Sequence, residues 1–331
     1  MPKRTVDLGA RVPLLDIVSY GRRGPGRRDN ITPAQRDHIE RTVRRTPEVM
    51  IKVSGGGRSL KAVKDHIEYI DREGNLDLET DEGERLSGDE AAKRLIEVWD
   101  LDLDVHRRQA AVAVTDRRKP PRLVHNLIFS MPAGTPPKKL LSAVRKFAQE
   151  EFALQHRYAM VLHTDQKHPH VHVVVKAMSE EGVRLNIRKA TLRNWRLEFA
   201  RHLRENGIEA NATDRAVRGA TTNRKADGIY RAIRRGDSSH MRERIQSVHS
   251  ELSTGGIRVE PGKAQLLATH REVDQGWRRV SELLEQESRH ELAAAVRRFV
   301  DSIPPAQTEK EWIARNLGVQ LENERVRETN F

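Results

Sequence analysis

One short segment of the chain holds four histidines and an aspartate at spacings that suit a metal site. It spans residues 163–172 and has the sequence HTDQKHPHVH. In a β-strand residues i and i+2 share a face, so His170 and His172 point together, while the valines between and after them point to the opposite, core-facing side. If the chain turns back before this strand, His163 comes opposite the pair. Three neutral imidazoles then converge on a metal site with open coordination positions.

Two further polar residues lie in the predicted turn. Asp165 is placed to hold one imidazole by its second ring nitrogen, which would fix the tautomer and the ring orientation. His168 is expected to face solvent or DNA. The alternative is that all of these are ordinary polar residues on the solvated face of a hairpin, but a third histidine and an aspartate at this spacing favour the metal site. The ion stays open, because imidazole suits later transition metals whereas phosphate-handling sites often use Mg²⁺ or Mn²⁺.

Tyrosine is the second candidate, because the chain holds only four, at positions 20, 69, 158 and 230. After a glycine-rich turn at 55–57, the spacing predicts a helix whose apolar stripe consists of Leu60, Val63, Ile67 and Ile70. At 100° per residue, Tyr69 lies roughly 140° from the centre of that stripe. We therefore expect Tyr69 to be presented at the surface, although an exposed helical tyrosine is also common without any function.

Hydrophobic periodicity predicts the elements that must position these residues. Strands are expected from Val49 onward and over 124–130, 158–164 and 170–178, and helices over 88–100, 136–152 and 190–206. The last two strands are joined by only a few residues, which permits an antiparallel hairpin and excludes a parallel crossover. We therefore expect an α+β fold with a mainly antiparallel sheet flanked by helices.

The distribution of charge along the chain indicates its domain organisation and the kind of molecule that it binds. Lys and Arg number 60 against 48 Asp and Glu, a net charge of +12. Such a balance favours nucleic acid or an acidic membrane surface, and the clustering of arginine favours nucleic acid. Residues 1–47 are expected to form a basic, mobile arm, 48–213 the folded domain, and 214–331 a basic linker and helical region.

The lack of a long apolar segment and the lack of cysteine exclude several classes of protein. No window approaches the roughly 18 apolar residues that a membrane span requires. The chain has no cysteine, which excludes disulfides, thiolate metal sites and cysteine nucleophiles, and suits a reducing cytoplasm. We expect a soluble protein that is not exported by the general secretory route.

Three ordered segments resemble the motifs of conjugative relaxases of the MobP type, mobilization nucleases similar to the T-DNA border endonuclease of Ti plasmids. The segments are SGGGRSLKAVKDHIEYIDREG, then HNLIFSMPAGT, then HTDQKHPHVHVVV, within about residues 50–207. The resemblance implies an HUH-endonuclease-like fold. It also implies a site- and strand-specific nick in DNA at an origin of transfer, with a 5′-phosphotyrosyl link that is later reversed to rejoin the strand.

The resemblance also implies roles for particular residues. Tyr69 falls on the nucleophile, and Asp165 on the residue that orients the first metal-binding histidine. The ligands of a divalent ion, Mg²⁺ or Mn²⁺, fall on His163, His170 and His172. Ser130 is similar to a DNA-backbone contact, and Gly55 to Gly57 to the turn that seats the tyrosine helix. Further DNA contacts are expected from the arginine clusters at Arg22, Arg23, Arg27, Arg28, Arg234 and Arg235.

The implied partners are single-stranded DNA, relaxosome accessory proteins and a type IV secretion coupling protein, in the bacterial cytoplasm and on transfer to a recipient cell with the DNA. Rolling-circle replication initiators share the chemistry, but in them the His-x-His precedes the tyrosine, whereas Tyr69 precedes His170 here. Two further hypotheses stay open. One is a basic DNA-binding accessory protein with a vestigial metal site, and the other is a metal-dependent hydrolase that uses water and has no need of Tyr69.

Overall fold

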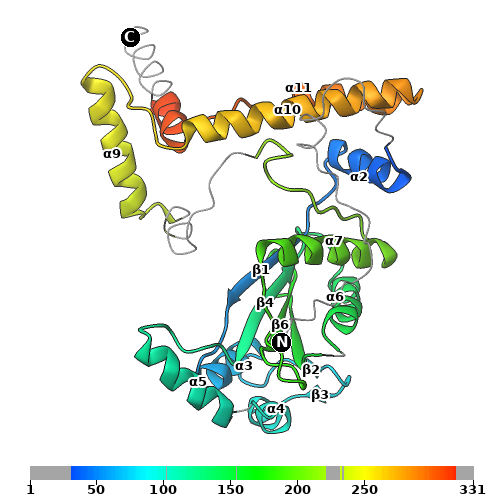
Figure 1. Ribbon diagram of the computed structural model, residues 1–331, viewed down its shortest axis with the longest axis vertical. Coiled ribbons are helices and arrows are strands. Elements are labelled where there is room, and N and C mark those ends of the chain that lie inside the picture. Colours follow the sequence, from blue (N-terminus) through cyan, green and yellow to red (C-terminus); the bar gives the residue numbers. More distant parts are fainter. Residues whose placement is uncertain (1–30, 102, 154, 221–231, 233–234, 318–331) are drawn as a thin grey trace, which may run out of the picture. The chain divides into compact units, whose positions relative to one another are not determined.

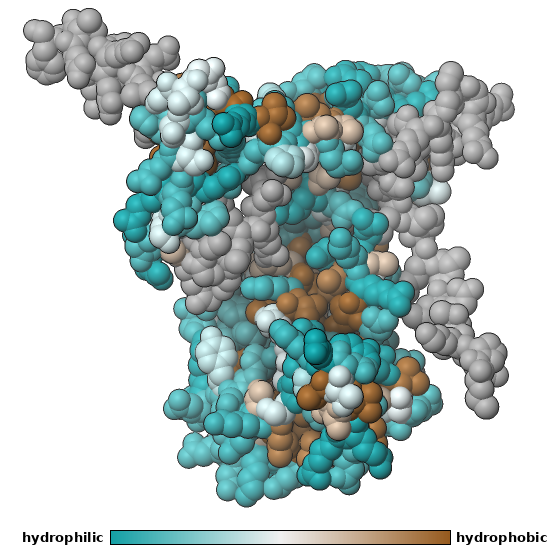
Figure 2. Space-filling view, turned by 60° about the vertical axis from the view of Figure 1, so that its left-hand side comes forward, coloured by the Kyte–Doolittle hydropathy of each residue, from teal (hydrophilic) through white to brown (hydrophobic). Residues whose placement is uncertain are grey.

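The computed structural model describes residues 31–101, 103–153, 155–220, 232 and 235–317. The chain divides into two compact units, one formed by 45–212 and the other by 1–44 together with 213–331. Within the described ranges no helix is both long and apolar enough to cross a membrane. On the face shown in Figure 2, hydrophilic residues predominate and hydrophobic residues lie in small groups between them.

Unit 45–212 is built on a six-stranded sheet with the order β1-β4-β6-β5-β2-β3 (Figure 1). Its strands are β1 (Met50–Gly55), β2 (Leu78–Thr80), β3 (Arg85–Leu86), β4 (Val124–Ser130), β5 (Tyr158–His163) and β6 (His170–Lys176). All neighbouring strands of this sheet pair antiparallel. The α+β fold with an antiparallel sheet is confirmed, and β6, which carries two of the candidate histidines, lies inside the sheet between β4 and β5.

Helices bury both faces of this sheet. Helices α6 (Pro137–Glu151) and α7 (Lys189–Glu205) share one hydrophobic cluster with Val171, Val173 and Val175 of β6. Helices α3 (Leu60–Ile70) and α4 (Ala91–Trp99) share another with Val174 on the opposite face, and α5 (Leu103–Thr115) follows α4. The valine face is therefore a core, as expected. The histidine face is a second core rather than a solvated surface.

Helix α3 begins at the glycine-rich turn, where close packing leaves no room for side chains. The Ser59 hydroxyl caps the helix by accepting the N–H of Ala62 at 3.3 Å. A Cβ at Gly57 would lie 2.5 Å from the Val63 side chain, and one at Gly56 would lie 2.2 Å from a backbone carbonyl oxygen of β4. The glycines thus allow the turn to lie close to the start of β4 at Gly56 and close to α3 at Gly57, which positions the helix that carries Tyr69.

The other unit contains α2 (Pro33–Val43), α9 (Ser239–Ser253), α10 (Lys263–Gln286) and α11 (His290–Asp301). Helix α2 opens with a capping box between Thr32 and Gln35. Its Ile39 is fully buried in the cluster that Trp277 of α10 and Phe299 of α11 also form.

These contacts correct the predicted arm. The sequence predicts a mobile segment that includes residues 31–44, because their apolar side chains are sparse. These residues fold because those side chains are covered by helices more than 200 positions later in the sequence. The remainder of the predicted arm, 1–30, lies outside the described residues.

Candidate active site

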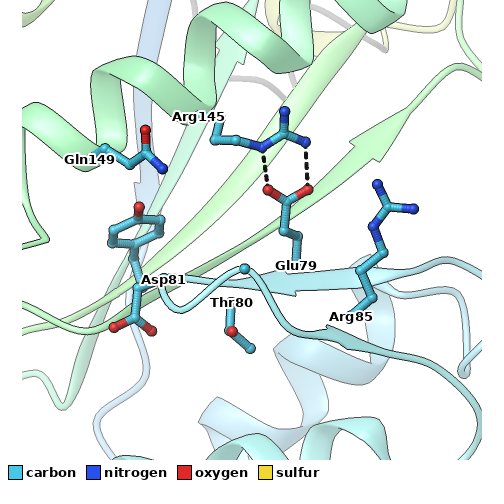
Figure 3. Close-up of a pocket in the computed structure, with 8 residues that line it drawn as sticks. Glu79, Thr80, Asp81, Arg85, Arg145 and Gln149 are labelled. Atoms are coloured by element: carbon cyan, nitrogen blue, oxygen red, sulfur yellow. Dashed lines mark hydrogen bonds and ion pairs between the residues drawn. The ribbon is translucent and has the colours of Figure 1, made fainter.

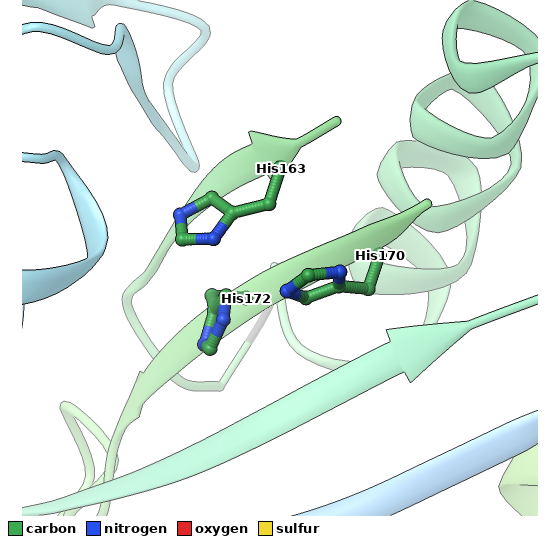
Figure 4. A group of neighbouring side chains, drawn as sticks. All are labelled: His163, His170 and His172. Carbon is green, nitrogen blue, oxygen red and sulfur yellow. The ribbon is translucent and has the colours of Figure 1, made fainter. Parts of the chain in front are cut away.

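Three buried histidines point toward one another at neighbouring ends of β5 and β6 (Figure 4). His163 pairs across the strands with His170, and His172 lies two positions further along β6 on the same face. The ring centroids are 4.5 to 5.1 Å apart. One ligand nitrogen from each ring lies within 4.8 Å of the others. The hairpin expected from the sequence therefore brings the three candidate ligands together.

The environment of the three rings keeps them suited to a metal. The Nε2–H of His163 donates to the Ile70 carbonyl at 2.6 Å, and the Nδ1–H of His170 donates to the His168 carbonyl at 3.0 Å. Each of these rings therefore keeps its other nitrogen unprotonated, and that of His163, Nδ1, lies 3.4 Å from Arg72 Nη2. The Nδ1 of His172 is buried, with no hydrogen-bond partner among the described residues. A divalent cation fits a set of inward-facing imidazole nitrogens of this kind.

Burial favours the neutral form of two of these imidazoles, His163 and His172. It lowers the pKa of His172 to about 3, and the neighbouring His163 and His170 lower it further. Burial also lowers the pKa of His163. A neutral imidazole retains the electron pair that a metal requires, so His163 and His172 can bind a cation at neutral pH without first losing protons.

Asp165 does not make the contact that we expected. The second ring nitrogen of His163 donates to the Ile70 carbonyl and not to this carboxylate. Asp165 instead accepts a hydrogen bond from Arg72 Nη2 at 2.6 Å, and the same Nη2 lies 3.4 Å from Nδ1 of His163. Arg72 therefore lies between the Asp165 carboxylate and His163 and contacts both. Sequence reasoning missed Arg72, because the direction of its side chain depends on a left-handed backbone turn.

Tyr69 is exposed, as its position off the apolar stripe predicted. Its side chain is 60% accessible, whereas Val63, Ile67 and Ile70 on the stripe are fully buried. Of the other tyrosines, Tyr158 is 1% accessible and burial raises its pKa to about 12. Tyr20 and Tyr230 lie outside the described residues. Among the described tyrosines, only Tyr69 offers its hydroxyl to a large external substrate.

Two side chains connect Tyr69 to the histidines. The ring of His66, one turn earlier on α3, stacks on Tyr69 with centroids 6.3 Å apart, and meets His172 edge-on at the same separation. The Arg72 guanidinium carbon lies 5.4 Å from the centre of the Tyr69 ring. His66 was also missed from the sequence, although its spacing of three residues from Tyr69 on one helix would have placed it on the same side.

The remaining predicted site residues are less accessible or lie elsewhere. Ser130 is 6% accessible and pairs across the strands with His170. Its hydroxyl donates to the Pro169 carbonyl at 3.4 Å, which leaves little surface for a direct contact with DNA. Arg235 is exposed and pairs with Asp237 at 3.1 Å. Five of the predicted arginines lie outside the described residues: Arg22, Arg23, Arg27, Arg28 and Arg234.

A second polar region lies near the other end of β5, around a cavity of about 260 Å³ (Figure 3). The Arg145 guanidinium forms a two-pronged ion pair with Glu79, in which Nη2 lies 2.7 Å from Oε2. Asp81 pairs with Arg157 at 2.7 Å. Of the side chains that the structure describes, only the histidine triad forms a group of potential metal ligands. This cavity therefore holds paired charges, while the open donors lie at the triad.

Comparison with known proteins shows what the region around the triad is similar to. The family model described as "Relaxase: MobA/VirD2-like, nuclease domain" matches residues 85–208, a range that includes the triad and begins after Tyr69. The chain is similar to the T-DNA border endonuclease VirD2 of Agrobacterium fabrum, at 26% identity over 59% of this chain and 46% of the relative. It is also similar to that of Rhizobium radiobacter, at 27% identity over 52% and 43%. The chain thus spans about half the length of the curated relatives it matches.

One solved structure also aligns with this chain. Its title is "Molecular Basis of Vancomycin Resistance Transfer in Staphylococcus aureus", and it covers 51% of this chain and 98% of its own. The identity is 13% and the TM-score is 0.31, a similarity too low to bear on the fold.

Proposed function

We propose that this chain, which carries a relaxase nuclease domain similar to that of the T-DNA border endonucleases, nicks one strand of DNA by tyrosine transesterification. The observation that carries the proposal is the exposed Tyr69 near three buried histidines whose ring nitrogens converge. A water-dependent hydrolase would need the triad alone. The proximity of Tyr69 to the triad, through His66 and Arg72, favours the tyrosine as nucleophile.

The residues support a definite sequence of bond changes. The Tyr69 oxygen forms a bond to phosphorus, the bond from phosphorus to the 3′ oxygen breaks, the phenol proton passes to solvent, and the 3′ oxygen takes up a proton. The products are a 5′-phosphotyrosyl protein and a free 3′-hydroxyl. Because one phosphodiester replaces another, the same site can run the exchange backwards and rejoin the strand.

The triad supplies the electrostatic part of this chemistry. His163, His170 and His172 would hold a divalent cation, and we propose Mg²⁺ or Mn²⁺, which hold phosphate oxygens well. When bound, such an ion neutralises the charge that grows on the phosphate oxygens during attack. The hydrogen bonds from His163 to Ile70 and from His170 to His168 fix the rings so that their donor atoms face inward.

The proposal extends to the substrate and the setting of the reaction. Single-stranded DNA at an origin of transfer fits the net charge of +12. Relaxosome accessory proteins and a type IV secretion coupling protein would be the protein partners, in a bacterial cytoplasm from which the chain travels attached to the DNA. A replication initiator is less favoured, because Tyr69 precedes the His-x-His motif in this sequence.

One experiment tests the proposal directly. The full chain is incubated in Mn²⁺ with labelled single-stranded oligonucleotides that tile the origin region of its own replicon, and products are resolved under denaturing conditions. We expect a labelled band that remains attached to protein, with the linkage mapped by peptide mass to Tyr69. Free oligonucleotide fragments with 5′-phosphate ends and no protein attached would identify a hydrolase. Linkage to Tyr20, Tyr158 or Tyr230 would reject Tyr69 as the nucleophile.

A further inference from the structure

Arg72 lies between the candidate nucleophile and the candidate metal ligands. Its guanidinium is 5.4 Å from the centre of the Tyr69 ring and forms an ion pair with Asp165 at 2.6 Å. The same Nη2 atom lies 3.4 Å from Nδ1 of His163. A phosphate that is reached at once by Tyr69 and by the triad must pass next to this cation.

The backbone that carries Arg72 is held in an uncommon conformation. Helix α3 ends at Ile70, and Arg72, Glu73 and Gly74 follow with φ angles of 57°, 56° and 83°. Left-handed backbone at two successive non-glycine residues is unfavourable, and it persists only where surrounding contacts enforce it.

Neighbouring contacts enforce this turn. The Asp71 carboxylate accepts the N–H of Gly74 at 3.1 Å, and the Asn75 side-chain amide donates to the Arg72 carbonyl at 2.7 Å. A Cβ at Gly74 would lie 2.3 Å from the backbone of Gly88. These contacts hold the turn in place. As a result, the Arg72 side chain lies over the ring of Tyr69.

Stability alone does not account for this arrangement. Arg72 and Asp165 retain 32% and 53% of their side-chain exposure, and ion pairs that are so open to solvent contribute little to stability. The polar contacts that the guanidinium makes with Asp165 and His163 both use Nη2. Among the residues that the structure describes, Nη1 and Nε of Arg72 have no protein partner. A guanidinium nitrogen with unused N–H groups, such as Nη1 here, is suited to donate to a phosphate oxygen.

We propose that Arg72 is a catalytic residue of the nicking step: its Nη1 donates to a non-bridging oxygen of the scissile phosphate while the Tyr69 oxygen attacks. The inference rests on the proposed function. The bonds that form and break are those of the tyrosine exchange, and Arg72 neither gains nor loses a proton. Asp165 is then a positioning residue, which holds the guanidinium by Nη2 and leaves Nη1 for the substrate.

The first test compares two substitutions that each remove one positive charge near α3. Arg72→Gln removes the proposed contact, and Lys64→Gln removes an exposed charge that pairs with Glu68 on α3 at 3.4 Å. Adduct formation is measured in a single turnover at saturating protein. We expect Arg72→Gln to slow it by about 10²- to 10³-fold, as loss of one preorganised donor to a developing charge does. Lys64→Gln should change it less than about threefold.

Two controls show whether the arginine variant keeps its site. Calorimetric titration with Mn²⁺ should give both variants the wild-type affinity, and Arg72→Lys should recover part of the rate because it retains the charge without the fork. A tenfold loss of Mn²⁺ affinity in both Arg72→Gln and Arg72→Lys would mean that Arg72 only holds the triad in place, which would overturn the proposal.

The second test asks whether Arg72 acts on the phosphate itself. An oligonucleotide with a methylphosphonate at the scissile position has lost one charged oxygen. With each stereoisomer of this substrate, the ratio of wild-type to Arg72→Gln rates is compared with the ratio on the natural phosphate. If Arg72 contacts that oxygen, the ratio falls toward one with at least one stereoisomer. An unchanged ratio with both stereoisomers would show that the arginine acts through protein structure only. If the wild-type chain forms no adduct on any natural oligonucleotide, the proposed function itself fails and this inference falls with it.

Discussion

The two ends of strand β5 carry similar residue types in opposite states. At one end, Tyr158, Glu79 and Arg145 surround a cavity, but the phenol is buried and the charges are paired with each other (Figure 3). At the other end, three buried histidines point toward one another (Figure 4). Tyr69, on α3, is 60% accessible.

This difference shows which features indicate chemistry in this fold. The cavity is lined by ion-paired groups, Glu79 with Arg145 and Asp81 with Arg157, and burial raises the pKa of Tyr158 to about 12. The triad instead brings three ring nitrogens within 4.8 Å of one another and lies next to a backbone turn held in a left-handed conformation. Reactive potential in this unit follows unsatisfied, converging groups rather than empty volume.

The largest expected effect comes from removing the hydroxyl of Tyr69. The matched control removes the hydroxyl of Tyr158, at the other end of β5. Tyr69→Phe should abolish the covalent adduct and leave oligonucleotide affinity within about twofold, because an exposed ring loses one oxygen and little packing. Tyr158→Phe, which removes the same atom from the buried ring, should form the adduct at the wild-type rate at saturating protein. Gel analysis of both variants checks this, and adduct formation by Tyr69→Phe would remove the distinction between the two ends.

The next largest effect concerns the ligands. Replacing His170 and His172 together by Ala should eliminate Mn²⁺ binding and nicking while the fold persists, because the hydrophobic clusters on both faces of the sheet remain. The control removes two exposed histidines of α9, with His240→Ala and His249→Ala together. Calorimetry with Mn²⁺ should separate the pairs. Equal metal affinity in both double variants would show that the triad is not the site.

A change at the cavity end should alter stability and not chemistry. Arg145→Met leaves the Glu79 carboxylate largely buried without its partner, which should lower the free energy of unfolding by about 1–3 kcal/mol. Arg85→Met, at an exposed position lining the same cavity, should cost less than about 0.5 kcal/mol. Urea denaturation gives both values. A nicking rate lowered by Arg145→Met under conditions where the protein is fully folded would contradict the assignment of this end as structural.

The smallest expected effect concerns the arginines at 22, 23, 27 and 28. Changing all four to Gln should weaken binding to cognate and scrambled single-stranded DNA equally, because arginine clusters bind phosphates and make few contacts with the bases. The slope of log affinity against log salt should flatten by up to about 0.7 for each phosphate that the variant no longer binds. Weaker binding of the cognate strand alone would mean that these residues read sequence. An unchanged slope would favour docking on an accessory protein.

The sequence was sufficient where the pattern is local. The limits of β4 were predicted to the residue, and the hairpin of β5 and β6, the meeting of the three histidines and the exposure of Tyr69 all follow from periodicities of two and of 3.6. The region over 214–331 was also expected to contain helices, and the structure has α9, α10 and α11 there.

The sequence was insufficient where position depends on distant partners or on backbone dihedrals. Helix α2 could not be predicted because Ile39 is covered by residues near the other end of the chain. Strands β2 and β3 are only 3 and 2 residues long, too short to show a period. Arg72 could not be connected with Asp165, because only a φ of 57° at that residue turns its side chain back toward the site.

The contacts that assemble the triad and those that join it to the tyrosine helix differ in their sequence separation. The three histidines belong to one hairpin with its turn over 164–169, whereas the hydrogen bond from His163 to Ile70, which joins the triad to the end of the tyrosine helix, spans 93 positions. A hairpin forms in microseconds, and contacts between distant segments follow more slowly because closing the longer loop costs more entropy. In a chain refolding from denaturant, we therefore expect metal affinity to return before the capacity to cut DNA, so that a folding intermediate holds the ion without the nucleophile.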